Sequence, residues 1–428
     1  MSEVIQFPHE GWSAQDAEHF LLGRERFGMR FGLDRIHRLL NVLDLGTVPF
    51  PSIEIVGTNG KSSTTRMTAA LLERHGLRTG CFTSPHLLSY RERIRVSEQD
   101  IAPERFAKQI ARTVRAAERV DRSQGDPDDR VTQFELLTAA ALVEFAAAKV
   151  DVAVLEAGLG GRYDATNAVD ARVAVLTNVG LEHTRYLGPT IADIAREKLD
   201  VVREGATLVV GPGLAQRARE HAWRITVERN AKLVRATEDR RLASQLAARG
   251  AFQRHNFAVA CAAARAFLGR ELDRDAVLDT AHSVTVPGRF EVHDGAPLLI
   301  LDGAHNPGGI EALTSSLPEV VLGRRLVAVV AILDDKDAAA MLRGLLAHAD
   351  GLVCTATASA RALPAATLAS LAGQLGAGEV LIETRPHEAL RRARELAGPD
   401  GVVLATGSIY LLSELLRDPG AIGPVSSL

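Results

Sequence analysis

The sequence of 428 residues is poor in the side chains on which nucleic-acid binding depends. Only 4% of its residues are aromatic, and 50 Lys and Arg residues are outnumbered by 53 Asp and Glu residues, for a net charge of −3. General nucleic-acid-binding proteins carry a basic excess, and those that bind single strands stack bases on aromatic rings. We therefore expect no nucleic acid among the partners of this protein.

Cysteine and long apolar runs are also scarce. The three cysteines, Cys81, Cys261 and Cys354, are odd in number and far apart, which excludes a disulfide framework and a cysteine-based zinc site and fits a reducing compartment. The first 20 residues lack a basic segment followed by an apolar run, and no apolar run approaches the roughly 18 residues that span a bilayer. These absences predict a cytoplasmic protein without a membrane partner.

The N-terminal part alternates apolar β-rich runs with helical patterns. The composition, 46% hydrophobic and 24% charged, is that of a globular protein, and the length exceeds one ordinary core. The alternation predicts an α/β fold with mostly parallel sheets. We expect strands at 52–56, near 81, at 152–156 and at 173–177, and helices that end near 75, begin near 103, and cover 134–149, 191–202 and 252–268.

A second alternating series begins at residue 298, after PGR and HDGAP interrupt the pattern between 286 and 295. Each of its strands is followed by a helix, which predicts a smaller, doubly wound, Rossmann-like C-terminal domain. We place the boundary so that residues 1–288 form the first domain and residues 289–428 the second. The expected strands are 298–301, 326–331, 352–354, 380–382 and 402–405, and the expected helices begin near 308, 337, 364, 387 and 409.

The most informative segment is IVGTNGKSST, residues 55–64, which follows a strand and opens a helix. Backbone N–H groups at such a turn bind phosphates, a lysine adds a positive charge near the β- and γ-phosphates, and a serine hydroxyl can bind Mg²⁺. This predicts a P-loop ATPase domain, although Ile55 replaces the first glycine of the strict pattern. A glycine-rich turn without a ligand is the alternative. The predicted ATP-binding residues here are Gly57, Thr58, Asn59, Gly60, Lys61, Ser62 and Ser63.

GTNGKS is also the phosphate loop of the Mur ligase superfamily, and the chain resembles the folylpolyglutamate/dihydrofolate synthase family over nearly its whole length. TSPHL and GLGGRxDATN, in this order around the phosphate loop, are specific to the folate branch. The matching segments are FGLDRIHRLL (31–40), GTNGKSST (57–64), TSPHLLSYRERIRV (83–96), TQFE (132–135), LEAGLGGRYDATN (155–167), TNVGLEHTRYLG (177–188), IAREKLDVV (194–202), PGRFE (287–291), DGAHNPGG (302–309) and TGSIYLLSEL (406–415).

The resemblance implies a Mg²⁺ site formed by Ser84, Glu156 and His183. Glu156 ends a predicted strand, where open α/β sheets bind their ligands, and a carboxylate suits Mg²⁺. His183 is an unusual Mg²⁺ ligand and rests on the resemblance alone. Lys198 matches a family lysine that is carbamylated and supports the metal centre, a modification that requires an uncharged amine. A solvated strand-end carboxylate and a surface helical lysine are the alternatives for Glu156 and Lys198.

For the acceptor substrate, the resemblance places His86, Phe134 and Glu135 near a pterin pocket. The Phe134 ring could stack on the pterin or belong to the core. By the same resemblance, the loop residues Arg162, Asp164 and Asn167 belong to the site around Glu156, without individual roles; ordinary polar loop residues are the alternative.

For the nucleotide and the amino acid, the resemblance implies that Asn256 lies near the adenine and that Arg289 reaches the ATP phosphates from the domain junction. Asp302 and His305 belong to a turn that closes over the nucleotide and engages the amino acid, and Ser408 lies on the glutamate side. The predicted catalytic residues are Lys61, Lys198 and His305.

Four segments depart from the family pattern. Ser62 replaces a glycine, Glu182 replaces an aspartate, Phe252 replaces the histidine of a His-Gln pair, and EKLDV (197–201) stands where the family has EKAGI. Ser62 could crowd the loop, and the changes at Glu182 and Phe252 affect substrate and adenine contacts. The phosphate, metal and domain-closure residues are all present.

The activity implied by the resemblance is that of an ATP-dependent acid–amino-acid ligase. ATP, the co-substrate, phosphorylates the carboxylate of dihydropteroate or a reduced folate, and the amine of L-glutamate then attacks the acyl phosphate. The family's usual form is a monomer. Two other functions stay open: a Mur-type amide ligase acting on a different acceptor, and a P-loop ATPase module that does not ligate.

Overall fold

The computed structural model describes residues 11–24, 31–123, 129–239, 242 and 245–418. Among these residues the chain divides into two compact units, the first made of residues through Thr237 together with Phe257–Thr280, and the second of Glu238–Asn256 and residues 281–418. The division therefore falls inside helices α10 (Ala251–Leu268) and α11 (Arg274–Ser283). The functional boundary at residues 288/289 stays a prediction. None of the helices in the described part of the chain combines the length and apolar character needed to cross a membrane.

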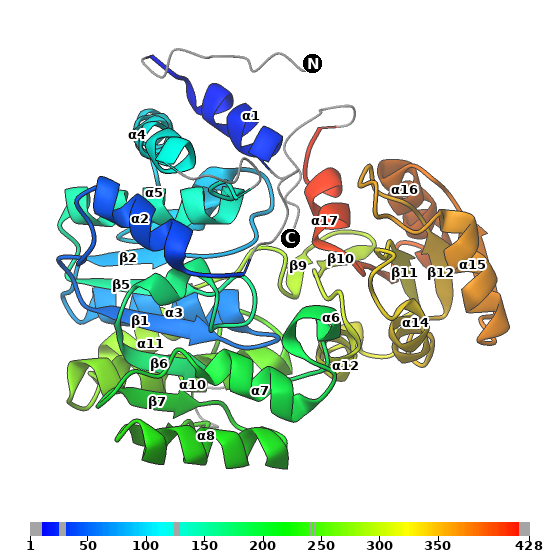
Figure 1. The fold of residues 1–428 in the computed structure, drawn as a ribbon. Helices are drawn as coiled ribbons and strands as arrows, with labels where there is room; N and C mark the ends of the chain where they lie inside the picture. Colours follow the sequence, from blue (N-terminus) through cyan, green and yellow to red (C-terminus); the bar gives the residue numbers. More distant parts are fainter. Residues whose placement is uncertain (1–10, 25–30, 124–128, 240–241, 243–244, 419–428) are drawn as a thin grey trace. The chain divides into compact units, whose positions relative to one another are not determined.

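The first unit is built on an eight-stranded sheet of order β4-β3-β2-β5-β1-β6-β7-β8, whose central strands are labelled in Figure 1. In the sheet, the neighbouring strands β2, β5, β1, β6, β7 and β8 pair in parallel. At the other edge, β3 and β4 pair antiparallel to their neighbours. All residues of β1 and β5 are buried, as expected for strands covered on both faces. The strands are β1 (Ser52–Val56), β2 (Thr79–Phe82), β3 (Ile94–Val96), β4 (Gln99–Asp100), β5 (Val152–Glu156), β6 (Ala171–Leu176), β7 (Thr207–Val210) and β8 (Lys232–Arg235).

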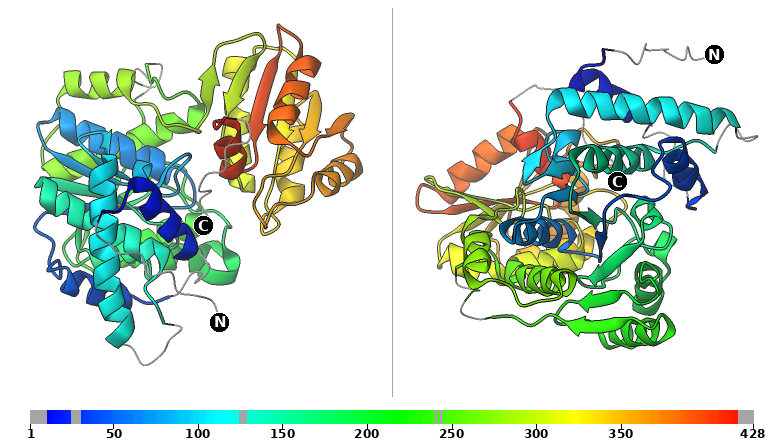
Figure 2. Two further views of the ribbon diagram at one scale, coloured as in Figure 1. Left: turned by 90° about the horizontal axis from the view of Figure 1, so that it is seen from above. Right: turned by 90° about the vertical axis from the view of Figure 1, so that its left-hand side faces the viewer.

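Two groups of helices enclose apolar cores of this unit. The long α4 lies beside α1 and α5 (Figure 2), and these helices and α2 pack with Phe82 and Leu155. Helices α7 and α8 pack together over Leu176 and Val210. The helices are α1 (Ala14–Arg24), α2 (Asp34–Val42), α3 (Lys61–Arg74), α4 (Pro103–Ser123), α5 (Gln133–Ala148), α6 (Thr184–Leu187), α7 (Ile191–Leu199), α8 (Gln216–Glu228), α10 and α11 (Arg274–Ser283), with the 3₁₀ helices η2 (Tyr90–Arg93) and η3 (Ala165–Ala168).

The second unit contains a six-stranded sheet of order β13-β12-β11-β14-β10-β9, parallel except for β9. Its core joins strand residues such as Val330 and Leu404 to helix residues such as Leu313 and Leu342. The predicted α/β class, with a doubly wound C-terminal unit, is confirmed. The elements are β9 (Glu291–His293), β10 (Leu298–Leu301), α12 (Pro307–Ser316), α13 (Pro318–Val321), β11 (Leu326–Val330), α14 (Ala338–Leu346), β12 (Gly351–Cys354), α15 (Ala365–Gln374), β13 (Glu379–Ile382), α16 (Pro386–Ala397), β14 (Val402–Thr406) and α17 (Ile409–Leu415).

Candidate active site

The phosphate loop connects the end of β1 to the first residue of α3, Lys61. Two of its glycines are required by the backbone. Gly60 has a φ of 83°, and Gly57 has a φ of 156°. A Cβ atom at Gly57 would lie 1.8 Å from Oγ1 of Thr177, so any side chain there would clash. The predicted strand–loop–helix context of the phosphate loop is therefore present.

The segment that follows β6 holds this loop in place. The Asn59 N–H donates to Oδ1 of Asn178 (2.8 Å), and the Thr177 hydroxyl donates to the Asn59 carbonyl (2.7 Å). The Gly180 N–H donates to the hydroxyl of Thr58 (2.9 Å). These side chains lie more than 115 residues apart in the sequence, with separations of 118, 119 and 122. The protein itself thus fixes the conformation of the loop, which limits the entropy lost when a nucleotide binds.

The two lysines predicted to be catalytic meet at the phosphate loop. Lys61 Nζ donates to the carbonyls of Gly57 (3.1 Å) and Thr58 (3.2 Å), and Lys198 Nζ donates to the same Gly57 carbonyl (2.8 Å). Lys198 is 4% exposed, so it is not a surface lysine. Burial, assisted by the nearby charge of Lys61, lowers the pKa of Lys198 to about 7. A large fraction of this amine is therefore uncharged near neutral pH, as carbamylation requires.

Glu156 connects the phosphate loop to the TSPHL segment. Its side chain is buried at the end of β5, and its Oε1 accepts a hydrogen bond from the Ser62 hydroxyl (2.8 Å) while Oε2 accepts one from the Ser84 N–H (3.0 Å). Ser62, the residue that departs from the family pattern, is accommodated by this contact. A carboxylate next to a hydroxyl group is a donor set that suits Mg²⁺ or Mn²⁺.

Within the described ranges, no three His, Cys, Asp or Glu side chains converge on one point. Few protein ligands are expected at the predicted Mg²⁺ site, because Mg²⁺ in nucleotide sites is bound by one or two carboxylates together with phosphate oxygens and water. His183 is the N-cap residue before α6 and has a left-handed φ of 50°, and its Nε2 lies 3.9 Å from Oε1 of Glu182. Its role as a metal ligand stays a prediction.

The predicted pterin-site residue His86 is 3% exposed and held by neighbours from its own segment. Its Nδ1 accepts a hydrogen bond from Nε of Arg93 (2.9 Å), and its ring centroid lies 4.3 Å from that of Tyr90. Arg93 also donates to the hydroxyl of Ser84 (3.4 Å). Arg93 therefore connects the predicted metal and pterin residues, a role that the sequence analysis missed although Arg93 lies in a matching segment.

Phe134 lies between a strand and the glycine-rich loop. The ring is half-buried, with its centroid 5.8 Å from that of Phe82. A Cβ atom at Gly158 would lie 2.7 Å from Cζ of Phe134, so the glycine allows the loop to cover the ring. The ring therefore belongs partly to the core, as the alternative reading expected, while its stacking on a pterin stays a prediction.

Glu135 has a role in the fold itself. It forms a capping box with Thr132 at the start of α5 and a buried ion pair with Arg35, with 3.1 Å between Arg35 Nε and Glu135 Oε1. Burial raises the pKa of Glu135, and the charge of Arg35 opposes this shift. Both carboxylate oxygens are engaged in these contacts, so a direct role in substrate binding stays a prediction.

In the second unit, the DGAHN turn and the turn before α17 meet at the carboxyl ends of the neighbouring parallel strands β10 and β14. The Gly407 N–H donates to the carbonyl of Ala304 (3.1 Å). Asp302 is buried and accepts hydrogen bonds from the N–H groups of Phe290 and Ala304 (both 2.8 Å). Burial raises the pKa of Asp302, which the charge of Arg289 opposes. The structure thus gathers four predicted residues in one turn cluster: Arg289, Asp302, His305 and Ser408.

Asn256 lies in the portion of α10 that belongs to the second unit. Its amide donates to Oε1 of Gln253 (2.9 Å) in the preceding turn, and both side chains are buried. Phe252, which replaces the family histidine, packs edge-on against Phe290, with 6.4 Å between ring centroids. This departure therefore replaces a polar group with an apolar contact next to the predicted adenine residue.

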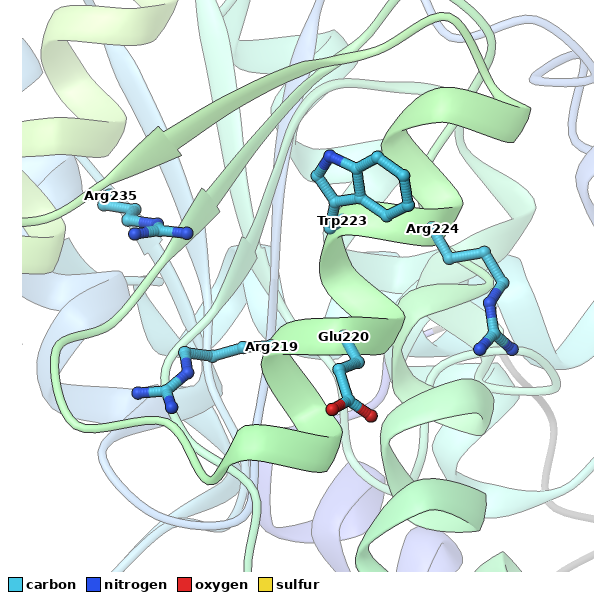
Figure 3. A pocket seen from close by; sticks show the side chains of 5 residues that line it. All are labelled: Arg219, Glu220, Trp223, Arg224 and Arg235. Atoms are coloured by element: carbon cyan, nitrogen blue, oxygen red, sulfur yellow. The ribbon is translucent and has the colours of Figure 1, made fainter.

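Two cavities lie away from these residues. One, of about 700 Å³, opens beside the 158–167 loop, where Arg162, Tyr186 and Glu197 line it. The other, of about 460 Å³, lies between α8 and the end of β8 (Figure 3). Arg162, a polar residue of the predicted loop, lines the first cavity, whereas none of the other residues predicted for the site lines either cavity. The candidate site is therefore the phosphate loop and its surroundings. The second cavity is lined by Arg219, Glu220, Trp223, Arg224 and Arg235.

Comparison with known proteins identifies the family. Residues 55–264 match the Mur ligase middle domain, and residues 288–409 match the glutamate ligase domain of Mur ligases. The chain is 36% identical to dihydrofolate synthase/folylpolyglutamate synthase of Mycobacterium tuberculosis over 407 residues, which cover 87% of this chain and 84% of the relative. The protein of the same name from Escherichia coli is 34% identical, with 90% of each chain covered. The chain belongs to the dihydrofolate synthase/folylpolyglutamate synthase family.

Solved structures of this family agree with the fold. Mycobacterium tuberculosis folylpolyglutamate synthase complexed with ADP has a TM-score of 0.86 at 34% identity, covering 95% of this chain and 99% of that chain. The Escherichia coli family member in complex with DHPP and ADP has a TM-score of 0.84 at 30% identity, covering 96% and 98%. A bifunctional folylpolyglutamate synthase/dihydrofolate synthase with Mn, AMPPNP and L-glutamate bound has a TM-score of 0.82 at 32% identity, covering 94% and 97%. The predicted family is thus confirmed.

Proposed function

We propose that this protein is an ATP-dependent ligase that forms an amide between the carboxylate of dihydropteroate or a reduced folate and the amine of L-glutamate. The observation that carries the proposal is the convergence of Lys61, Lys198 and the Ser62–Glu156 pair at one phosphate loop, in a chain from this family. Relatives bind ADP, DHPP and L-glutamate, which are the classes of ligand that this reaction needs.

In the first step, the acceptor carboxylate attacks the γ-phosphorus of ATP, and ADP leaves. The N–H groups of the phosphate loop and the N-terminus of α3 orient the phosphates. Lys61 now hydrogen-bonds loop carbonyls, and it turns from them to the β- and γ-phosphates when the nucleotide binds. Since the reactants are all anionic, placing them together is the main task of the protein.

A divalent cation accompanies ATP, with Glu156, the hydroxyls of Ser62 and Ser84, and His183 as the proposed protein ligands. A relative is bound to Mn together with AMPPNP, and Mg²⁺ is the proposed ion in this protein. When bound, the ion neutralises charge on the phosphate oxygens. Ser62 and Ser84 already contact the Glu156 carboxylate and hold it in a fixed orientation.

Lys198 supports this centre as a carbamate. Its uncharged amine attacks CO₂ and loses one proton, which converts a neutral amine into an anion beside the phosphate loop; starting from the ammonium ion, two protons are lost in all. The lowered pKa of Lys198, about 7, supplies that amine near neutral pH, and burial protects the product from solvent. An arginine at this position could not undergo the reaction.

In the second step, the amine of glutamate attacks the carbonyl carbon of the acyl phosphate. The amine loses a proton, the C–N bond forms, and phosphate leaves with one oxygen of the original carboxylate. Residues 289–428 serve the glutamate side through Asp302, His305 and Ser408 and supply Arg289 for the ATP phosphates. Residues 1–288 bind ATP, with Asn256 for the adenine, as well as the metal and the pterin near His86, Phe134 and Glu135. We propose a monomer as the working form.

ADP release, followed by mass analysis of the product, tests the proposed function. The protein is assayed with ATP, Mg²⁺ and glutamate, and with dihydropteroate, a reduced folate or a cell-wall nucleotide peptide as acceptor. We expect ADP release that depends on both a pterin acceptor and glutamate, and a product heavier by one or more glutamyl residues. Stimulation by the peptide alone would instead indicate a Mur-type ligase, and hydrolysis without glutamate would indicate an ATPase module.

A further inference from the structure

Three buried side chains, linked by hydrogen bonds, connect the loop 158–167 to the centre of the large sheet. Glu54 occupies the middle of β1 and is 1% exposed. The Thr166 hydroxyl oxygen lies 2.9 Å from Oε1 of Glu54 and 2.7 Å from Oδ1 of Asp164. Both distances are those of hydrogen bonds between oxygens.

Counting protons shows that one of the two carboxyl groups is protonated. A threonine hydroxyl has one proton and can donate it to only one of its two carboxyl neighbours. If Glu54 and Asp164 were both ionised, one carboxylate oxygen would face the hydroxyl lone pairs without a proton between them. The two short distances are both satisfied only when one carboxyl group donates to the hydroxyl, which in turn donates to the other.

The surroundings identify Glu54 as the protonated group. Asp164 accepts hydrogen bonds from the N–H of Leu159 (2.8 Å, to Oδ2) and from the N–H of Thr166 (3.1 Å, to Oδ1), which stabilise its ionised form. In the part of the chain that the structure describes, no donor contacts Oε2 of Glu54. A buried carboxylate oxygen without a donor is costly when charged, but a neutral carboxyl group tolerates it better.

We propose that Glu54, in its protonated form, is a positioning residue that holds the loop 158–167 in place for acceptor binding. The Glu54 proton bonds to Thr166, Thr166 donates to Asp164, and Asp164 holds the N–H of Leu159. Leu159 is next to Gly158, the residue that covers the Phe134 ring. The link from the loop to the acceptor rests on the proposed function, whereas the protonation of Glu54 does not.

Few charged groups surround Glu54. Burial raises the pKa of Glu54 to about 8, and the charge of Asp164 adds to the shift, whereas the contact with the Thr166 hydroxyl and the charge of Arg203 oppose it. Arg203 is itself engaged, because it pairs with Asp170 (2.7 Å) and donates to Oδ1 of Asn167 (2.8 Å). Its distribution over these partners explains why its charge does not ionise Glu54.

The pH dependence follows from this pKa. The ordinary pKa of a glutamate in the unfolded chain is 4.5, so between pH 4.5 and about 8 the folded protein holds one more proton than the unfolded protein. Glu54 therefore lowers stability progressively as the pH rises through this range. Above pH 8, Glu54 ionises in the folded state as well, and its bond to Thr166 is lost.

Comparison of the wild type with Glu54→Gln tests the stability part without any substrate. The glutamine amide can donate to Thr166 at every pH and does not ionise. We expect the Tm of the variant minus the Tm of the wild type to become steadily more positive from pH 5 to pH 8 and then to level off. A difference independent of pH would overturn the proposal, because it would show that Glu54 does not change its protonation on folding. This outcome leaves the proposed ligase function untouched.

The acceptor KM tests the positioning part. With a pKa of about 8, the protonated fraction of Glu54 falls about tenfold between pH 7 and pH 9, so the wild-type acceptor KM rises by up to about tenfold if only the protonated form binds the acceptor. In Glu54→Gln the acceptor KM should rise much less, while the KM for ATP follows the same pH profile in both proteins. Thr166→Val, which removes the hydroxyl that links Glu54 to Asp164, should raise the acceptor KM at every pH. Identical pH profiles of the acceptor KM in wild type and Glu54→Gln would refute the positioning role.

Discussion

Substitution of Gly158 by alanine tests whether the glycine-rich loop and Phe134 together shape the acceptor site. The new Cβ atom would lie 2.7 Å from Cζ, 2.9 Å from Cε2 and 3.2 Å from Cε1 of the Phe134 ring. Carbon atoms in contact prefer separations of about 3.5–4.0 Å, so the ring or the loop must move by close to 1 Å.

The magnitude follows from the cost of overpacking, which is about 1–3 kcal/mol for an added methyl group in a packed site. Because the Phe134 ring is half-buried, it can move toward solvent, and the cost then falls on the geometry of the acceptor site. At about 1.4 kcal/mol per factor of ten, the acceptor KM should rise between about fivefold and about 140-fold. The KM for ATP should stay within about twofold, since a substitution away from a site usually changes a free energy by about 0.5 kcal/mol or less.

The assay is ADP release at saturating ATP and glutamate with varied acceptor. The control is Phe134→Leu, whose shorter side chain lacks the ring atoms that clash. In the Gly158→Ala background, Phe134→Leu should cost less than it does alone, with a coupling of about 0.5–3 kcal/mol, as expected for residues in contact. An acceptor KM that is unchanged in folded Gly158→Ala, or strictly additive effects of the two substitutions, would refute this reasoning.

Three other predictions concern the phosphate loop. Lys61→Ala should lower kcat by about 10³-fold with Tm and circular dichroism unchanged, because it removes the positive charge that stabilises the phosphate oxygens in the transition state. Glutamate-dependent ADP release at the wild-type rate would contradict this. Lys198 should be carbamylated more fully as the pH rises through its pKa of about 7, because the uncharged amine fraction grows, so activity at limiting bicarbonate should rise between pH 6 and pH 8. Lys198→Arg should be insensitive to bicarbonate. Ser62→Gly removes the hydroxyl that contacts Glu156 and should raise the Mg²⁺ concentration for half-maximal activity by about 10-fold, as for other groups that orient a metal ligand.

The sequence predicted the buried central strands closely. The predicted strands 52–56 and 152–156 coincide with β1 and β5, because fully buried parallel strands form continuous apolar runs between turn residues. The short strands β3, β4, β7, β8 and β9 were missed. Lys232–Arg235 has charged residues at both ends and only two partly buried apolar residues between them, and it is a strand because it pairs with β7. Pairing with a distant partner leaves little local signal.

The site shows the same division between local and distant information. The phosphate loop could be predicted because its strand, glycines and helix are consecutive. The contacts that hold it could not, since Asn178 reaches Asn59 across 119 residues and Lys198 reaches Gly57 across 141. That Glu135 both caps α5 and pairs with Arg35 could not be predicted from the sequence either. The joint enclosure of the substrates by both domains, the monomeric state and the cytoplasmic location stay predictions.

The transfer of oxygen from the acceptor to phosphate tests the central claim most directly. The acceptor is labelled with ¹⁸O in its carboxylate and incubated with the protein, ATP, Mg²⁺ and glutamate, and the released phosphate is analysed by mass spectrometry. Attack of glutamate on an acyl phosphate leaves one carboxylate oxygen on phosphate, so we predict one ¹⁸O in each phosphate and one fewer in the amide product. Phosphate without ¹⁸O would show that water attacks ATP directly, which would contradict ligation through an acyl phosphate.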